Sequence, residues 1–131
     1  MKSLSPITTL FIFLLLLPAT SANYAQNSEL RRLIGNWELT RINVEGVKGT
    51  ISFTSKAGQT TGAFRSSDGK TSEINDIRFQ HGAYSFRVPS LNLVFKDLKF
   101  VGTKLEGNLI DNSESNPKGR LVPLAVRMTK K

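Results

Sequence analysis

Residues 71–101 read TSEINDIRFQHGAYSFRVPSLNLVFKDLKFV and show the pattern of the chain most clearly. Apolar and polar residues alternate along three runs in it, and turn-forming residues separate the runs at His81-Gly82 and Pro89-Ser90. A period close to two is typical of a strand with one buried face, whereas an amphipathic helix needs a period of about 3.6. The stretch therefore predicts three antiparallel strands joined by short turns, at 70–79, 83–88 and 91–101.

Two segments of this stretch repeat one pattern around an aspartate. They read INDIRF at 74–79 and FKDLKF at 95–100. In both, the apolar residues before and after the aspartate do not keep the alternation of a single strand. In a regular strand the later ones would therefore point to the opposite face, unless the strand contains one extra residue as a bulge. We therefore predict β-bulges at Asp76 and Asp97, and bulges bend strands in a way that helps a sheet to close.

The rest of the chain continues the pattern. Further strands are predicted at 35–44, 49–56, 60–66, 104–111 and 120–129, and a single helical turn at 29–33 with Ser28 as its cap. Eight antiparallel strands hide one apolar face and lose their edges when the sheet closes, so we expect an all-β, eight-stranded antiparallel meander closing into a small barrel. A β-sandwich is the alternative. Pro123 has no N–H, so within the last predicted strand it must face a gap, a bulge or an open seam.

The N-terminus has the order of a secretory signal. Lys2 precedes an apolar run at 7–17, and the small residues at 19–22 follow. Roughly eleven apolar residues are too few for a membrane-spanning helix. We expect a signal peptide at 1–22, cleaved after Ala22, and one barrel domain at 23–131. The protein should be secreted or periplasmic, with no transmembrane span after cleavage.

The charge is basic but dispersed. The chain has 18 Lys and Arg against 10 Asp and Glu, a formal charge of +8, and cleavage would remove only Lys2. The basic residues are spread almost evenly along the sequence, which is more typical of a solvated surface than of a nucleic-acid-binding stripe. We expect a monomer with no nucleic-acid partner. Weak binding of another polyanion stays open.

Few residues suit catalysis. His81 is the only histidine and lies in a predicted turn, and the chain has no cysteine. No Ser-His-acid, Walker or Rossmann pattern occurs, and the acids stand singly. The sequence therefore predicts no enzyme: we expect no catalytic residues, no metal site and no cofactor.

Two features at the ends of the domain carry a resemblance. Gly35-Asn36-Trp37 opens the first predicted strand, and Arg127 lies in the last one. Here the sequence resembles the calycins, the lipocalin-like barrels, and is similar to small exported bacterial lipocalin-like domains of unknown function. In that family the tryptophan plugs one end of the barrel, and a basic side chain crosses it to reach the backbone of the entry turn. The resemblance implies a closed-end signature of Gly35, Trp37 and Arg127.

Aromatic residues raise the question of a ligand. Candidate ligand-lining residues are Phe53, Tyr84, Phe86 and Phe95, with any pocket expected at the end opposite Trp37, near Phe86 or Phe95. An eight-stranded barrel is just wide enough to be filled by side chains or to hold one small molecule. We expect an exported non-enzymatic binding protein whose candidate ligand is a small apolar or amphipathic molecule. The alternative is a filled barrel that acts as a protein- or envelope-interaction module, inhibitor-like or polyanion-binding.

Overall fold

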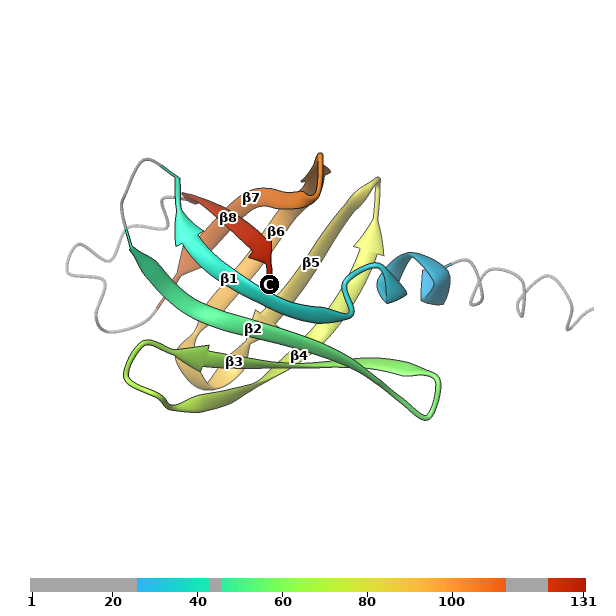
Figure 1. Ribbon diagram of the computed structural model, residues 1–131, viewed down its shortest axis with the longest axis horizontal. Helices are drawn as coiled ribbons and strands as arrows, with labels where there is room; N and C mark the ends of the chain where they lie inside the picture. Colours follow the sequence, from blue (N-terminus) through green and yellow to red (C-terminus); the bar gives the residue numbers. More distant parts are fainter. Residues whose placement is uncertain (1–25, 43–45, 113–122) are drawn as a thin grey trace, which may run out of the picture.

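The computed structural model describes residues 26–42, 46–112 and 123–131, and its strands form a closed antiparallel barrel (Figure 1). Each strand pairs with the next, and β8 pairs with β1. The all-β meander is therefore confirmed. The elements are β1 (Gly35–Arg41), β2 (Val47–Lys56), β3 (Gln59–Ser66), β4 (Thr71–Gln80), β5 (Ala83–Val88), the 3-10 helix η1 (Pro89–Leu91), β6 (Leu93–Val101), β7 (Lys104–Asp111) and β8 (Leu124–Lys130).

Two-residue turns hold consecutive strands side by side. Ala57 and Gly58 join β2 to β3 with φ of 52° and 79°, and His81 and Gly82 join β4 to β5 with φ of 53° and 76°. Turns with two left-handed residues match the right-handed twist of the strands that they connect. These local turns explain why neighbours in the sequence are neighbours in the barrel.

Both predicted bulges are confirmed. Asp76 and Asp97 have left-handed backbones, with φ of 54° and 56°. The register of β4 against β5 shifts between Asn75 and Arg78, and the register of β6 against β7 shifts between Lys96 and Lys99. Aspartate is among the few non-glycine residues that adopt this conformation readily. Each bulge absorbs one residue and keeps the apolar side chains on both sides of it facing inward.

The same motif recurs in two successive hairpins. In β4–β5, Asp76 forms an ion pair with Arg87 of the following strand, at 3.5 Å. In β6–β7, the equivalent Asp97 accepts a hydrogen bond from Nδ2 of Asn108 at 3.4 Å. The side chain of each bulge is thus held by a residue from the next strand.

Strand β4 changes partner at its bulge. Its first residues pair with β3, with Gly62 opposite Ile74 as the last pair, and from Asn75 onward β4 pairs with β5. The β2–β3 hairpin continues past this point as a two-stranded ribbon, which diverges from β4 in Figure 1. The segment over which β3 and β4 pair is therefore short.

The core lies inside the barrel. It consists entirely of hydrophobic residues, and no polar or charged residue of the described part is buried. Leu30 and Leu33 belong to it although they precede β1, because the short helix at 26–31 and its following turn cover one end of the barrel (Figure 1). The helical turn predicted at 29–33 thus begins earlier, and Ser28 lies within the helix rather than capping it.

Several predicted boundaries differ from the observed ones. Strand β6 begins at Leu93, not at 91, because Pro89–Leu91 form a 3-10 helix that ends at the left-handed Asn92. Pro123 precedes β8 and so needs no gap in the ladder. The signal peptide at 1–22 and the predicted strand residues 43–44 and 120–122 lie outside the described residues.

Gly107 packs against the backbone of the bulge at Asp97. A Cβ atom at this position would lie 2.8 Å from the backbone oxygens of Lys96 and Asp97, and backbone cannot move aside as a flexible side chain can. We expect Gly107→Ala to lower the free energy of unfolding by about 1–3 kcal/mol, as overpacking does. Urea denaturation would measure the change. The neighbouring Asn108→Ala, which removes only one exposed hydrogen bond, should cost less than about 1 kcal/mol. Equal stabilities of Gly107→Ala and the parent would contradict this account of the bulge.

Candidate functional site

Trp37 closes the end of the barrel beneath the N-terminal helix. Only 1% of the residue is accessible to solvent. Its Nε1 donates a hydrogen bond of 2.7 Å to the carbonyl oxygen of Leu33, and its ring packs against Phe100 with the centroids 6.2 Å apart. The indole therefore contributes both apolar area and a polar link to the entry turn.

The basic residue near Trp37 is Lys130, not Arg127. Lys130 is the register partner of Trp37, and its Nζ lies 5.5 Å from the centroid of the indole ring. Arg127 projects from the outer face, where its Nε and a terminal nitrogen both lie 2.8 Å from Oε1 of Glu106. The assignment of Arg127 to the closed end was wrong, because it alternates with the buried Val126 and Met128 and so points outward.

Gly35 lies beside Lys130 at the same end of the barrel. Its φ is +137°, a conformation that L side chains rarely adopt, and a Cβ atom there would lie 2.6 Å from Cε of Lys130. The glycine therefore leaves room for the stem of the lysine. The structure brings together Gly35, Trp37 and Lys130 in place of the expected set.

Tyr84 ties the helix to the barrel. Its hydroxyl lies 3.1 Å from the carbonyl oxygen and 3.2 Å from Oε2 of Glu29. Burial, the largest cause, raises the pKa of Tyr84 to about 12. Arg32 of the same N-terminal segment stacks over the Phe100 ring at 4.3 Å. Tyr84 thus lies at the closed end, in contact with the chain's own helix, rather than at the opposite end.

The other three candidate ligand-lining residues pack on one another. The rings of Phe86 and Phe95 stack with centroids 4.6 Å apart and an interplanar angle of 22°, and Phe53 meets Phe86 edge to face at 5.3 Å. No more than 1% of any of the three residues is accessible to solvent. These side chains act as the core of the barrel in this structure.

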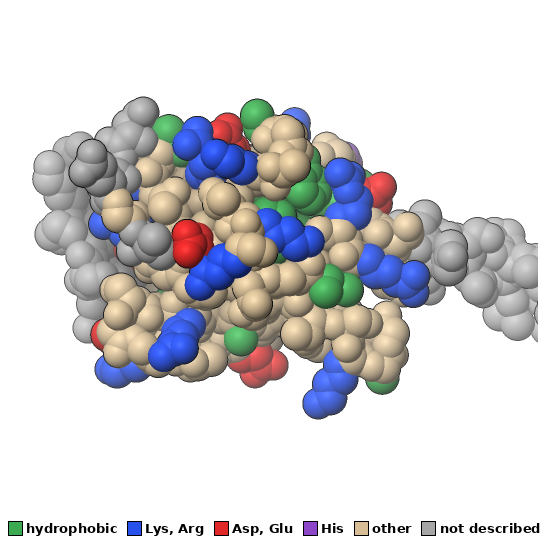
Figure 2. All heavy atoms as spheres, in the orientation of Figure 1, with side chains coloured by type: hydrophobic (Ala, Val, Ile, Leu, Met, Phe, Trp, Pro, Cys, Tyr) green, Lys and Arg blue, Asp and Glu red, His purple; other side chains and the backbone are tan. Residues whose placement is uncertain are grey.

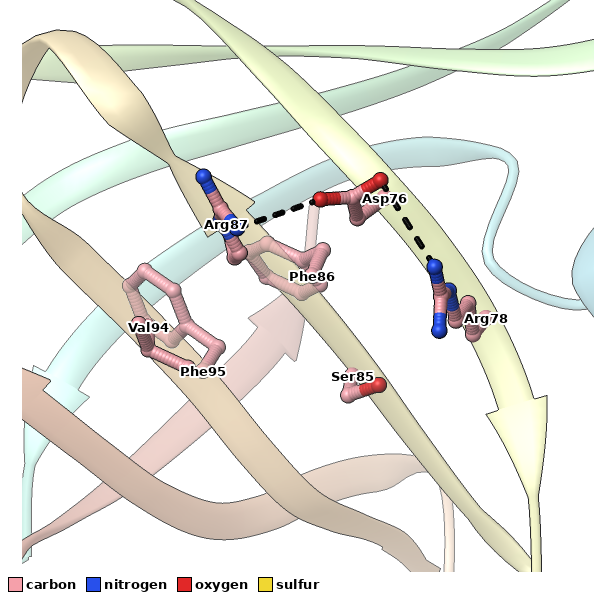
Figure 3. Close-up of a pocket in the computed structure, with 7 residues that line it drawn as sticks. All are labelled: Asp76, Arg78, Ser85, Phe86, Arg87, Val94 and Phe95. Carbon is pink, nitrogen blue, oxygen red and sulfur yellow. Dashed lines mark ion pairs between the residues drawn. The ribbon is translucent and has the colours of Figure 1, made fainter.

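A hollow on the outer surface lies over the same rings. We call it the arginine hollow; it has a volume of about 210 Å³ and is lined by Asp76, Arg78, Ser85, Phe86, Arg87, Val94 and Phe95 (Figure 3). It spans β4, β5 and β6 where the two bulges disturb the ladder on either side of β5. In Figure 3, Arg78 and Arg87 approach the carboxylate of Asp76 from opposite sides.

Two guanidinium groups share one carboxylate in this hollow. Arg87 lies 3.5 Å and Arg78 3.9 Å from the oxygens of Asp76, and all three side chains are about half exposed. Exposed pairs of this kind contribute less than about 1 kcal/mol each, so an acidic group of a ligand can compete for the arginines. Guanidinium groups bind carboxylate or phosphate through paired donors. The arrangement suits an anionic group.

Sequence reasoning missed these arginines. Arg78 is the basic residue of the first repeat, two positions after Asp76. Arg87 follows Asp76 by the same number of residues as Asn108 follows Asp97 in the second repeat. Aligning the two repeats through the following strand would have placed Arg87 opposite the aspartate. In the second copy the equivalent residues are Lys99 and Asn108, which offer no pair of guanidinium groups.

Other site chemistry is sparse. Across residues 26–42, 46–112 and 123–131, no three His, Cys, Asp or Glu side chains come together as a metal site would require. The same ranges contain no helix that is long and apolar enough to cross a membrane. Lys and Arg side chains are dispersed over the face in Figure 2, without a continuous basic stripe.

A double-mutant cycle tests the closed end. Lys130→Ala and Trp37→Phe should couple by about 0.5–1 kcal/mol in the free energy of unfolding, because the ammonium group lies near the indole face. Arg127→Ala and Trp37→Phe should be additive to within about 0.5 kcal/mol, since the two side chains lie on opposite faces. Coupling of Trp37 to Arg127 rather than to Lys130 would contradict the place of Lys130 at the closed end.

Tyr84 should make stability depend on alkaline pH. Because its pKa is about 12 in the folded protein and 10.0 without the fold, the unfolded chain loses its proton first, and stability falls as the pH rises from about 10 to 12. The fall should be about 2 kcal/mol. Tyr84→Phe should be less stable than the parent at pH 9 by about 1 kcal/mol, through the lost hydrogen bond, and more stable than the parent by about 1 kcal/mol at pH 12, because only the parent loses the stability that depends on the neutral phenol. A gap that is equal at both pH values in urea denaturation would contradict the buried, neutral phenol.

Comparisons with protein-family models, with curated proteins and with solved structures find no match to this chain. The closed eight-stranded antiparallel barrel is compatible with a lipocalin-like fold.

Proposed function

We propose that this is an exported, non-enzymatic binding protein that recognises an acidic group of its partner with the outer surface of a filled barrel. The binding site is the arginine hollow. The observation that carries the proposal is that Arg78 and Arg87 converge on a single exposed carboxylate beside a surface hollow.

The packing of the interior favours the outer surface. A ligand inside the barrel would have to move at least one of the rings of Phe53, Phe86 and Phe95, which pack against one another with almost no accessible surface. Removing a buried aromatic side chain from its packing costs about 3–5 kcal/mol. An external partner meets no such cost. Of the two readings of the sequence, the interaction module with a filled barrel therefore has the stronger support.

The charges favour an acidic partner. With both arginines bound to Asp76, the three side chains keep one positive charge in excess, and the two guanidinium groups carry more N–H donors than one carboxylate can engage. Ser85 adds a hydroxyl group and Val94 an apolar contact in the same hollow. The formal charge of the full chain, +8, or +7 after removal of Lys2, attracts acidic partners over longer distances.

A titration with hexaglutamate tests the proposal. At low salt, the amide resonances of residues 76–78 and 85–87 should shift in NMR spectra of the parent protein. Replacing both Arg78 and Arg87 with Gln should weaken binding at least about ten-fold, which corresponds to about 1.4 kcal/mol. The matched control is Lys99→Gln, at the equivalent position of the second repeat, and it should bind like the parent.

Diffuse polyanion binding predicts a different result. If the overall charge alone attracts hexaglutamate, Lys99→Gln should weaken binding as much as either single arginine variant does. Shifts spread over the whole surface, or equal losses in all variants, would overturn the assignment of the hollow.

A further inference from the structure

A groove opens where β3 and β4 separate. It has a volume of about 620 Å³; one wall is the β2–β3 ribbon with Lys56, Thr60 and Thr61, and the other is β4 with Asn75, Asp76 and Ile77. We call it the seam groove. It begins just past the pair Gly62 and Ile74, the last one that joins the two strands.

The ribbon wall of the groove presents unpaired backbone. Lys56 and Gln59 flank the two-residue turn, so they form a hydrogen-bonded pair, and in an antiparallel ladder such pairs alternate with non-bonded ones. Thr60, opposite Ser55, therefore belongs to a non-bonded pair, and its N–H and C=O point away from β2 into the groove. No described residue pairs with Thr60 on that side.

The opposite wall is also a free strand edge. From Asn75 to Gln80, β4 pairs with β5 on one side and with no described strand on the other. Exposed strand edges add a further strand readily, because its main chain satisfies the unpaired donors and acceptors. Two such edges facing one groove suit an extended peptide.

The side chains indicate which peptide fits. Asp76 lines both the seam groove and the arginine hollow, so a strand lying along β4 passes directly beside the hollow. Arg78 lies two residues further along the same outer face, and Lys56 stands on the ribbon wall. Ile74 and Ile77 give the groove apolar contacts, and Glu73 adds a carboxylate where the groove begins, next to the last pair of β3 and β4. Cross-strand neighbours of opposite charge stabilise a sheet, so acidic side chains suit the outward positions of the added strand next to Arg78 and Lys56, beyond Glu73, and apolar ones the inward positions.

We propose that the seam groove binds an extended segment of a partner protein, with alternating apolar and acidic residues, as an added strand beside β3 and β4. The inference rests on the proposed function, since the acidic residues of that segment are the groups that Arg78 and Arg87 bind.

A peptide of defined pattern tests the inference. The probe is the hexapeptide acetyl-Val-Glu-Val-Glu-Val-Glu-amide, added to the purified chain. It should bind and slow the hydrogen exchange of the Thr60 amide at least ten-fold. The same peptide with alternate backbone nitrogens methylated keeps the charges and side chains but cannot complete the ladder. It should bind at least ten-fold more weakly.

Proline variants on the two edges of the ribbon provide the matched comparison. Thr60→Pro removes the N–H that faces the groove, and Ser55→Pro removes the corresponding N–H on the other edge. Thr60→Pro should abolish peptide binding and Ser55→Pro should not. If Thr60→Pro does not fold, as judged by circular dichroism, the comparison of plain and methylated peptides on the parent protein still decides the question.

The outcomes separate this inference from the proposed function. Binding of hexaglutamate at the arginine hollow together with equal binding of plain and methylated peptides would overturn the added strand alone. Loss of both hexaglutamate and hexapeptide binding would overturn both. If concentrated protein without peptide dimerises and protects the Thr60 amide, the occupant is a second copy of the chain, and the acidic segment is overturned.

Discussion

The barrel depends on two β-bulges, one at Asp76 and one at Asp97, each of which accommodates one extra residue in its strand. In β4 and β6 the apolar side chains before and after these aspartates differ in parity, so a regular strand would send Phe79 and Phe100 to solvent. The left-handed backbone at each aspartate corrects the parity. Both phenylalanines then pack at the closed end, Phe79 against Tyr84 and Phe100 against Trp37.

The two bulges are alike in geometry and differ in what surrounds them. Asp97 lies between strands that stay paired on both sides of β6, and its partner is the neutral Asn108. Asp76 lies where β4 leaves β3, and its partners are two arginines. One repeat of the motif therefore serves mainly to bend the sheet. The other also produces a hollow with excess positive charge and a free strand edge.

Local features of the fold could be predicted from the sequence, and contacts between distant strands could not. The period of two, the turn at His81-Gly82 and the parity changes are all visible within a few residues, and the structure contains them. The contact between Trp37 and Lys130 depends on the register of β1 against β8, which are at opposite ends of the domain. Only the alternation with Val126 and Met128 could have shown that Arg127 points outward. Phe86 and Phe95 could line a pocket or stack on each other, and the choice depends on how the rings pack, which cannot be derived from the composition of the chain.

The energetics of the barrel favour recognition at its seam. Opening the interior would expose stacked aromatic side chains, each worth about 1.5–3 kcal/mol of burial. Opening the closed end would break the hydrogen bonds from Trp37 to Leu33 and from Tyr84 to Glu29. At the seam the edges of β3 and β4 are already apart, so a partner strand would form main-chain hydrogen bonds without breaking any in the ladder. A partner strand can therefore be added at the seam while the core of the barrel stays intact.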